Sequence, residues 1–128
     1  MAGSMPSLKD ILTRPSSKIV FNAPFDEKHI YYIEIANMGT HRIAFAIKTT
    51  NLKRFDVKPC YGILNPKETT VLAVSCETFN PASENLCGER ITVEWTKIPR
   101  DASQEFSTSW FRDDGAVCRK IMPVEYNL

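Results

Sequence analysis

Basic side chains are concentrated in residues 47–68, which read IKTTNLKRFDVKPCYGILNPKE. The cluster consists of Lys48, Lys53, Arg54 and Lys58. The whole chain of 128 residues has a formal net charge of only +1, so this local concentration is distinctive. Clustered positive charge attracts an acidic segment and speeds its encounter with the protein, although each exposed ion pair contributes only about 0 to 1 kcal/mol. The stretch is therefore a candidate binding surface for an acidic partner.

Thr49, Thr50 and Arg90 extend this candidate surface. The two threonines offer hydroxyl and backbone hydrogen bonds to an extended peptide or to a strand of a neighbouring subunit. Arg90 comes from a later run, and we expect it to converge with the basic cluster at one edge of the fold. A second interpretation is a solvated, charged edge that discourages unwanted strand pairing. The residues alone give the two interpretations equal weight.

Residues that support catalysis are few. The sequence has no GxSxG, GxxxxGK[ST], GxGxxG or HExxH motif, and its two histidines, His29 and His41, are twelve residues apart. Two pairs of adjacent carboxylates lie in predicted turns, where solvation and turn formation explain them. These pairs are Asp26 with Glu27 and Asp113 with Asp114. We therefore predict a protein that is not an enzyme and uses no cofactor.

The four cysteines are Cys60, Cys76, Cys87 and Cys118. They show no CxxC spacing, and Cys76 and Cys118 fall in apolar, strand-like segments where a free thiol acts as a small hydrophobic side chain. We expect all four to be reduced. No close pair of ligands anchors a zinc site that would combine them with a histidine, so we predict no metal site.

The composition is that of an ordinary globular domain, with 43% hydrophobic and 24% charged residues in a chain long enough for one core. A net charge of +1 gives no broad attraction to nucleic acid or to an anionic membrane. No apolar run approaches the roughly 20 residues needed to span a bilayer, and the N-terminus lacks the apolar core of a secretory signal. We expect a cytoplasmic protein with neither nucleic-acid binding nor membrane insertion.

Alternating segments predict the elements that must position the basic cluster. In residues 29–37, for example, Ile33 and Ile35 share one face, the period of two expected for a half-buried strand. The other candidate strands are residues 18–25, 42–48, 69–76, 89–95 and 116–126. Pro123 interrupts the last of these and suggests an edge position or a bend. Strands separated by regular turns favour an all-β, antiparallel two-sheet sandwich of about seven strands.

One segment has a helical pattern. The sequence DASQEFSTSWFRDD, residues 101–114, offers Asp101 or Ser103 as a capping residue. A helix there would bring Phe106 and Trp110 together at i and i+4 and bury both aromatic rings on the sheet. We therefore predict one short helical segment.

Several long segments resemble the major sperm protein family of nematodes, in order and with similar spacing. They include SKIVFNAPFDEKHIYYIEIAN, RIAFAIKTTNLKRFDVKPCYGILNPKE, LAVSCETFN, RITVEW, SWFRDDGAVCRK and the final PVEYNL. The resemblance runs from about Asp10 to the C-terminus. It implies an N-terminal extension of residues 1–17 and an immunoglobulin-like, seven-stranded domain of residues 18–128.

The same resemblance implies what the protein does. Members of this family form homodimers that assemble into non-polar filaments without nucleotide, and these filaments drive the crawling of amoeboid sperm. The expected location is the cytoskeleton of the sperm pseudopod, and the expected partners are other copies of the chain and regulatory proteins of filament assembly. One member of the family is also released as an extracellular signal to oocytes.

The basic stretch also resembles the electropositive face of the VAP proteins of the endoplasmic reticulum, which bind acidic peptides carrying two phenylalanines. Lys48, Thr49 and Thr50 stand at the positions of the KTT motif of that family, and Arg90 stands where the VAP proteins carry a binding lysine. Thr92 replaces a methionine that lines their peptide pocket. The alternative function is therefore a single-domain adaptor that binds acidic peptides and does not polymerise.

Pro15 and Pro59 are candidates for cis peptide bonds. Each precedes or ends an extended run at a point where a sandwich strand can cross from one sheet to the other, and the resembling family has cis prolines at the matching positions. The two successive prolines of that family are Pro59 and Cys60 here. We predict a cis bond at Pro59 and treat Pro15 as the second candidate.

Overall fold

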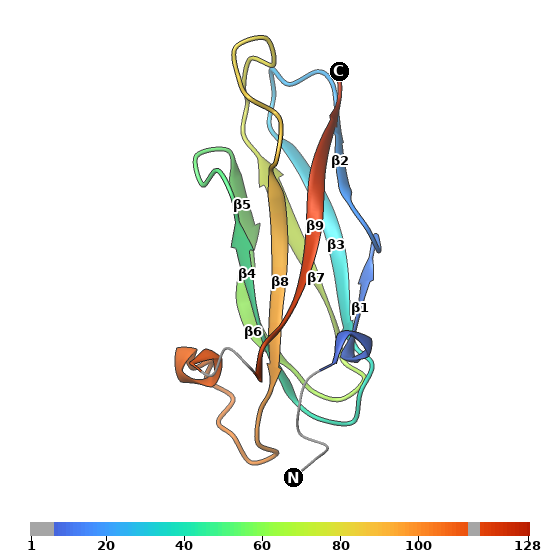
Figure 1. Cartoon of the computed structure of the whole chain (residues 1–128), viewed down its shortest axis with the longest axis vertical. Coiled ribbons are helices and arrows are strands. Elements are labelled where there is room, and N and C mark those ends of the chain that lie inside the picture. Colours follow the sequence, from blue (N-terminus) through green and yellow to red (C-terminus); the bar gives the residue numbers. More distant parts are fainter. Residues whose placement is uncertain (1–6, 113–115) are drawn as a thin grey trace.

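Two β-sheets packed face to face form the protein in a computed structural model that describes residues 7–112 and 116–128 (Figure 1). The described residues contain nine strands and the short 3-10 helices η2 (Leu8–Asp10) and η3 (Thr108–Phe111). The strands are β1 (Ile11–Arg14), β2 (Ile19–Asn22), β3 (His29–Asn37), β4 (Ile43–Thr49), β5 (Phe55–Lys58), β6 (Tyr61–Leu64), β7 (Thr69–Cys76), β8 (Arg90–Lys97) and β9 (Cys118–Asn127). The predicted all-β, immunoglobulin-like sandwich is confirmed.

One sheet has four strands in the order β1-β3-β7-β5, and the other has five in the order β2-β9-β8-β4-β6. All pairs are antiparallel except β2 with β9, which is parallel. The parallel pair exists because β2 continues the run of β1 after the chain has crossed to the second sheet. Because β1 already pairs with β3, the sandwich begins at Ile11, whereas the domain was expected to begin at residue 18.

Two extended runs each supply a strand to both sheets, which explains why the described residues form nine strands where about seven were expected. The first run gives β1 to one sheet and β2 to the other, with Pro15 between them. The second gives β5 and β6 in the same way, with Pro59 between them. The Arg14–Pro15 and Lys58–Pro59 bonds are cis, and so is Ala23–Pro24, which the sequence analysis did not single out.

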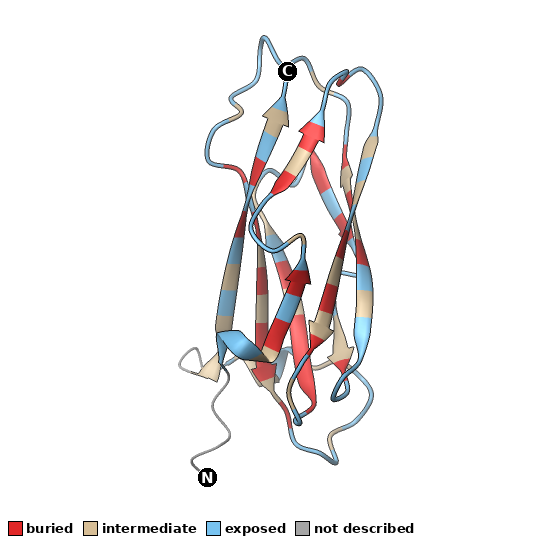
Figure 2. Ribbon diagram, turned by 90° about the vertical axis from the view of Figure 1, so that its right-hand side faces the viewer, coloured by how far each residue is buried: buried red, intermediate tan, exposed pale blue. Residues whose placement is uncertain are grey.

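The core lies between the sheets and follows the predicted alternation (Figure 2). The inward side chains of β3, β4, β7 and β8 are almost fully buried, with Trp95 the largest of them. Ala44, expected on the outer face of β4, is also buried, as is its cross-strand neighbour Thr96. A segment after β8 covers this outer face. Its Ala116 carbonyl accepts a hydrogen bond of 2.7 Å from Thr96 Oγ1.

The predicted helix in residues 101–114 is shorter than expected. Only Thr108–Phe111 is helical among the described residues of this segment, and Ser107, not Asp101 or Ser103, caps it by accepting a hydrogen bond from the Ser109 amide. Serine and threonine side chains compete for backbone hydrogen bonds and so disfavour a longer helix here. Asp113 and Asp114 lie outside the described residues.

The aromatic contact predicted in this segment is present. The rings of Phe106 and Trp110 meet edge-on with centroids 5.9 Å apart, and Phe106 packs on Tyr61 of β6 at 4.6 Å. Both Phe106 and Trp110 are half-buried, so the segment lies on the sheet without entering the core.

Pro123 lies within β9, which is an interior strand in the order of its sheet. However, β9 pairs with β8 over residues 118–123 and with β2 only from residue 124 onward. Pro123 therefore lies just before the point where β9 begins to pair with β2. Its missing amide removes no hydrogen bond between β9 and β2. The expectation of an edge strand is wrong, although the local environment resembles an edge.

Candidate functional site

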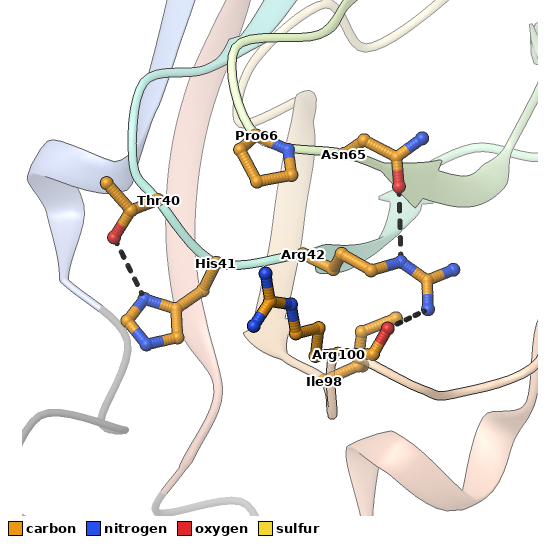
Figure 3. Close-up of a pocket in the computed structure, with 7 residues that line it drawn as sticks. All are labelled: Thr40, His41, Arg42, Asn65, Pro66, Ile98 and Arg100. Carbon is orange, nitrogen blue, oxygen red and sulfur yellow. Dashed lines mark hydrogen bonds between the residues drawn. The ribbon is translucent and has the colours of Figure 1, made fainter.

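Pockets open at both ends of strand β8. Near Ile98, a pocket of about 610 Å³ is lined by Thr40, His41, Arg42, Asn65, Pro66, Ile98 and Arg100 (Figure 3). Near Arg90, a pocket of about 130 Å³ is lined by Lys48, Thr49, Thr50, Arg90 and Thr92. The second pocket contains residues predicted from the sequence, whereas the first does not.

Four of the predicted binding residues meet at this smaller pocket, and we call them the basic edge: Lys48, Thr49, Thr50 and Arg90. Backbone contacts hold them together, since the Thr50 amide donates to the Arg90 carbonyl at 3.2 Å. In return, the Arg90 amide donates to Thr50 Oγ1 at 3.0 Å. Lys48 and Arg90 are exposed, so their charges face solvent. The geometry brings a small cationic surface to one end of β4 and β8.

Lys53 and Lys58 are less closely associated with the basic edge. Lys53 is exposed in the loop between β4 and β5. Lys58 belongs to the other sheet, where Phe55 and Val57 of β5 point into the core and Lys58 points outward. Its ammonium group lies 3.7 Å from the Asp56 carboxylate. Lys58 therefore flanks the basic edge from the opposite face of the sandwich and does not converge on it.

Arg54, predicted as part of the binding surface, is buried instead. Its side chain is only 4% exposed and forms ion pairs with Glu89 at 2.6 Å and Glu84 at 2.8 Å. Arg54 Nη1 also lies 3.1 Å from the Tyr126 hydroxyl oxygen, and its guanidinium carbon lies 4.2 Å from the centre of the Phe79 ring. A buried guanidinium held by two carboxylates cannot bind an external partner, so its role is structural.

Electrostatics in this buried group follow from the contacts. Burial lowers the pKa of Arg54, but hydrogen bonds with Tyr126 and Glu84 outweigh that effect and raise the pKa above its ordinary value. Burial raises the pKa of Tyr126, and the hydrogen bond that its hydroxyl donates to Glu89 raises it further. Arg54 and Tyr126 therefore stay protonated throughout the physiological range.

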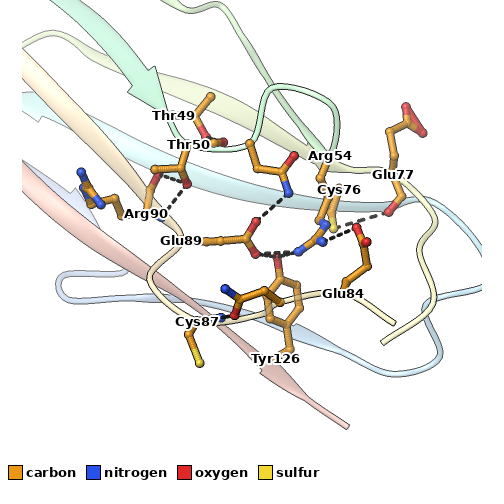
Figure 4. A network of polar contacts seen from close by, with 12 residues as sticks. Thr49, Thr50, Arg54, Cys76, Glu77, Glu84, Cys87, Glu89, Arg90 and Tyr126 are labelled. Carbon is orange, nitrogen blue, oxygen red and sulfur yellow. Dashed lines mark hydrogen bonds and ion pairs between the residues drawn. The ribbon is translucent and has the colours of Figure 1, made fainter. Parts of the chain in front are cut away.

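The buried group also fixes the basic edge (Figure 4). Glu89 accepts a hydrogen bond of 2.9 Å from Asn51 Nδ2, and these two residues are the chain neighbours of Arg90 and Thr50. We call Asn51, Arg54, Glu84, Glu89 and Tyr126 the Arg54 network. It joins the β4–β5 loop, the segment before β8 and the end of β9. The exposed residues of the basic edge are thus anchored to buried ion pairs.

A shallow apolar groove adjoins the basic edge. It has a volume of about 330 Å³ and is lined by Ile47, Lys48, Thr49, Leu52, Phe55, Asp56, Val57 and Cys60. Strand β6 pairs with β4 only over Ile43–Ala46. The Ile47 amide still donates a hydrogen bond of 2.8 Å to the Cys60 carbonyl. Within the described part of the chain, residues 48–49 of β4 therefore have β8 on one side and no paired strand on the other. An extended peptide could add to β4 here with apolar side chains in the groove.

Exposed apolar side chains cover the outer face of the four-stranded sheet. They are Leu12, Ile30, Tyr32 and Val71, each pointing away from the core on β1, β3 or β7. Tyr32 is 64% exposed, and Ile30 and Val71 are about half exposed. We call this the apolar face. Glu34 of β3 is the cross-strand partner of Val71, so one half-buried carboxylate interrupts this face. Groups of exposed apolar side chains are typical of protein interaction sites.

Among the described residues, no group of three His, Cys, Asp or Glu could hold a metal ion. His29 lies within 2.5 Å of the Pro24 carbonyl oxygen, and His41 lies beside Thr40. The four cysteines are free thiols. Burial raises the pKa of Cys76 to about 11, which makes this thiol unreactive. No helix in residues 7–112 or 116–128 is long and apolar enough to cross a membrane.

Comparisons with known proteins identify close relatives. Residues 10–115 match the family model described as the MSP (Major sperm protein) domain. The chain is 56% identical to major sperm protein isoform beta of Ascaris suum over 128 residues, which is 100% of both chains. It is 51% identical over 127 residues to major sperm protein 10/36/56/76 of Caenorhabditis elegans, with 99% of each chain covered.

Solved structures share the fold at lower identity. WR4, an MSP family member of C. elegans, aligns with a TM-score of 0.68 and 20% identity over 90% of this chain and 95% of that chain. PapD-like domain 7 of human CEP192 aligns with a TM-score of 0.59 and 10% identity over 93% of this chain and 85% of that chain. These two likenesses concern the sandwich itself.

Proposed function

Because the chain belongs to the major sperm protein domain family, we propose that it is a structural protein of nematode sperm whose homodimers assemble into motility filaments. The observation that carries this proposal is the 56% identity to an Ascaris suum major sperm protein along the full length of both chains. Assembly proceeds without nucleotide, and the protein is not an enzyme. The partners are other copies of the chain and regulatory proteins of filament assembly, in the cytoplasm and pseudopod of sperm.

The apolar face supports self-association. Leu12, Ile30, Tyr32 and Val71 would lose water contact if a second copy covered them, and burial of apolar surface is the main favourable term in protein association. A two-fold dimer uses the same patch on both subunits, which a flat sheet face can supply. Arg14 and Glu34 are cross-strand partners within this face, with Glu34 next to Val71, and would contribute polar contacts.

The groove beside Lys48 favours a second candidate function, a single-domain adaptor that binds acidic peptides. An acidic tract would lie near Lys48, Lys53 and Arg90 while apolar side chains enter the groove. The open end of β4 would pair with the peptide backbone. This mode requires no polymerisation, so the two functions predict different behaviour in solution.

Sedimentation of the purified protein across concentration, with and without a water-excluding precipitant, tests the first proposal when combined with electron microscopy. We expect dimers that grow into filaments without nucleotide. Tyr32→Glu should weaken dimerisation, whereas Ile121→Glu, an equally exposed apolar position on the other sheet, should not. A particle that stays monomeric at every concentration contradicts the filament proposal. Binding of an acidic peptide that Lys48→Glu abolishes would then establish the adaptor.

A further inference from the structure

The pocket at the Ile98 end of β8 has an unusual concentration of cationic side chains. Arg42 and Arg100 both line it, and His41 lies beside them. Figure 3 shows the Arg100 guanidinium turned back toward His41, with the Arg42 guanidinium on the other side. None of the lining residues is acidic. The pocket therefore presents positive charge without a negative side chain of its own.

Arg42 is the buried member of this group. Its side chain is 8% exposed, and its guanidinium donates to three oxygens, all of them neutral. Nε donates to Asn65 Oδ1 at 3.1 Å, while Nη1 donates to the carbonyls of Arg100 at 3.3 Å and Ala102 at 2.6 Å. The third nitrogen, Nη2, is buried and has no hydrogen-bond partner within residues 7–112 and 116–128. No carboxylate of the described residues lies within ion-pair distance of Arg42.

Arg54 provides an internal comparison at the other end of the same sandwich. It is buried to a similar degree, at 4% exposure, but two carboxylates contact it at 2.6 Å and 2.8 Å. A buried charge without a counter-ion is costly, because the lost hydration is not replaced. The fold meets this cost with internal carboxylates at Arg54, whereas at Arg42 it supplies three neutral acceptors and no counter-ion among the described residues. The geometry is that of a cation prepared for an anion from outside the chain.

The surrounding residues suit an oxygen-rich anion. Arg100 is exposed and free to turn toward a ligand, and among the described residues it forms no ion pair. Thr40 and Asn65 add a hydroxyl and an amide at the pocket wall. The planar fork of an arginine side chain matches the oxygens of carboxylate and phosphate. Two permanent guanidinium charges favour a doubly charged phosphate group over a single carboxylate.

We propose that this pocket binds a phosphate group, with Arg42 as the fixed buried charge that attracts it and Arg100 as the exposed cation that contacts it. The Ile98 amide donates a hydrogen bond of 3.0 Å to the Arg42 carbonyl, which anchors the segment carrying Arg100 beside the pocket. The site is separated from the basic edge by the length of β8, about 23 Å for its eight residues. It does not depend on the filament or adaptor proposals.

Titration with inorganic phosphate, followed by two-dimensional amide NMR at constant ionic strength, tests the site. We expect saturable shifts at residues 40–42, 65 and 98–102, and a much weaker response to acetate. Arg100→Ala should lower phosphate affinity by about tenfold or more, the effect of one charge-assisted hydrogen bond. Lys28→Ala removes one positive charge from an exposed site at the other end of β3 and should leave the affinity unchanged.

A second variant separates the fork of Arg42 from its charge. Arg42→Lys keeps the positive charge but removes the planar donor set, so we expect it to fold and to bind phosphate more weakly. A melting curve near that of the parent protein confirms that the variant is folded. No saturable response in the parent protein, or equal losses in Arg100→Ala and Lys28→Ala, would overturn the proposal.

The source of the phosphate group is distinguished by a further titration. A short neutral peptide carrying one phosphoserine should bind more tightly than inorganic phosphate if the pocket receives a phosphorylated protein side chain. Equal or weaker binding of that peptide would indicate a free phosphate ion or a small phosphate ester. Both results support a phosphate site. If Arg100→Ala loses the binding of inorganic phosphate and of the peptide, both ligands bind in the same pocket.

Discussion

Substitution of Arg54 by methionine is the sharpest test of the buried ion pairs beneath the basic edge. Methionine fills most of the space of the aliphatic stem but leaves Glu89, which is 7% exposed, without its cation. Asn51 and Tyr126 would still donate to Glu89. Those two neutral donors replace only part of the lost interaction, because the carboxylate stays buried and charged.

The magnitude follows from this geometry. Removing one partner of a buried pair costs about 3–5 kcal/mol. A domain of 128 residues has a total stability of roughly 6–19 kcal/mol, so the variant should still fold. Its melting temperature should drop by roughly 12–20 °C, at about 4 °C for each kcal/mol. The exposed ion pair to Glu84, whose side chain is 46% exposed, adds little to this loss.

Urea denaturation followed by tryptophan fluorescence measures the loss, with Lys53→Met as the matched control. Lys53 is the chain neighbour of Arg54 and carries the same charge, but it is exposed, so its replacement should change stability by no more than about 0.5 kcal/mol. Replacing both members of the pair, in Arg54→Met with Glu89→Gln, should recover part of the loss. A cost below about 1 kcal/mol for Arg54→Met would refute the argument that Arg54 is a buried structural cation.

Three further predictions concern the core and the basic edge. Gly62→Ala would bring a Cβ to 2.9 Å from two ring carbons of Phe45, which is 2% exposed, so we expect a loss of about 1–3 kcal/mol in urea denaturation. A neutral result would show that the ring can move aside. Burial raises the pKa of Cys76 from 9.0 to about 11, so the folded state retains a proton that the unfolded chain releases. Stability should therefore be complete below pH 9 and decline toward pH 11, by up to about 3 kcal/mol from this thiol. Cys76→Ala should show a smaller decline, and an identical one would contradict this origin. Reversing the charge of Lys48 and Lys53 should leave the melting temperature nearly unchanged and weaken the binding of an acidic partner. A large loss of stability would make both residues structural.

The longer strands could be predicted because their side chains alternate clearly. The limits expected for residues 29–37 and 69–76 agree with β3 and β7. The runs that became β1, β5 and β6 were not identified as strands. Each has only four residues, too few for a period of two to be recognised; prolines follow β1 and β5 directly, and Gly62 lies within β6. Pro15 and Pro59 were expected as points where a strand can cross between the sheets, but no strand was assigned on both sides of either proline.

The candidate site could be predicted only in part, because the sequence shows where basic residues cluster but not which of them are buried. Lys53 and Arg54 are adjacent basic residues in one loop, and nothing in their spacing shows that one is exposed and the other buried. The distinction comes from partners far along the chain, because Arg54 contacts residues 30, 35 and 72 positions away. No sequence pattern indicates that Glu84, Glu89 and Tyr126 act together. Their common role exists only once the two sheets have packed.

The two buried arginines show how one sandwich can separate stability from recognition. Arg54 has carboxylates, a tyrosine and an aromatic ring around it, and through Asn51 and Glu89 it holds the residues next to the basic edge. Arg42 is nearly as buried but has only neutral acceptors and one nitrogen without a partner. A charge fully paired inside the chain can only stabilise the fold. A charge that the fold buries without a counter-ion favours an anion from outside the chain, and this is the basis of the phosphate site proposed at this end of the molecule.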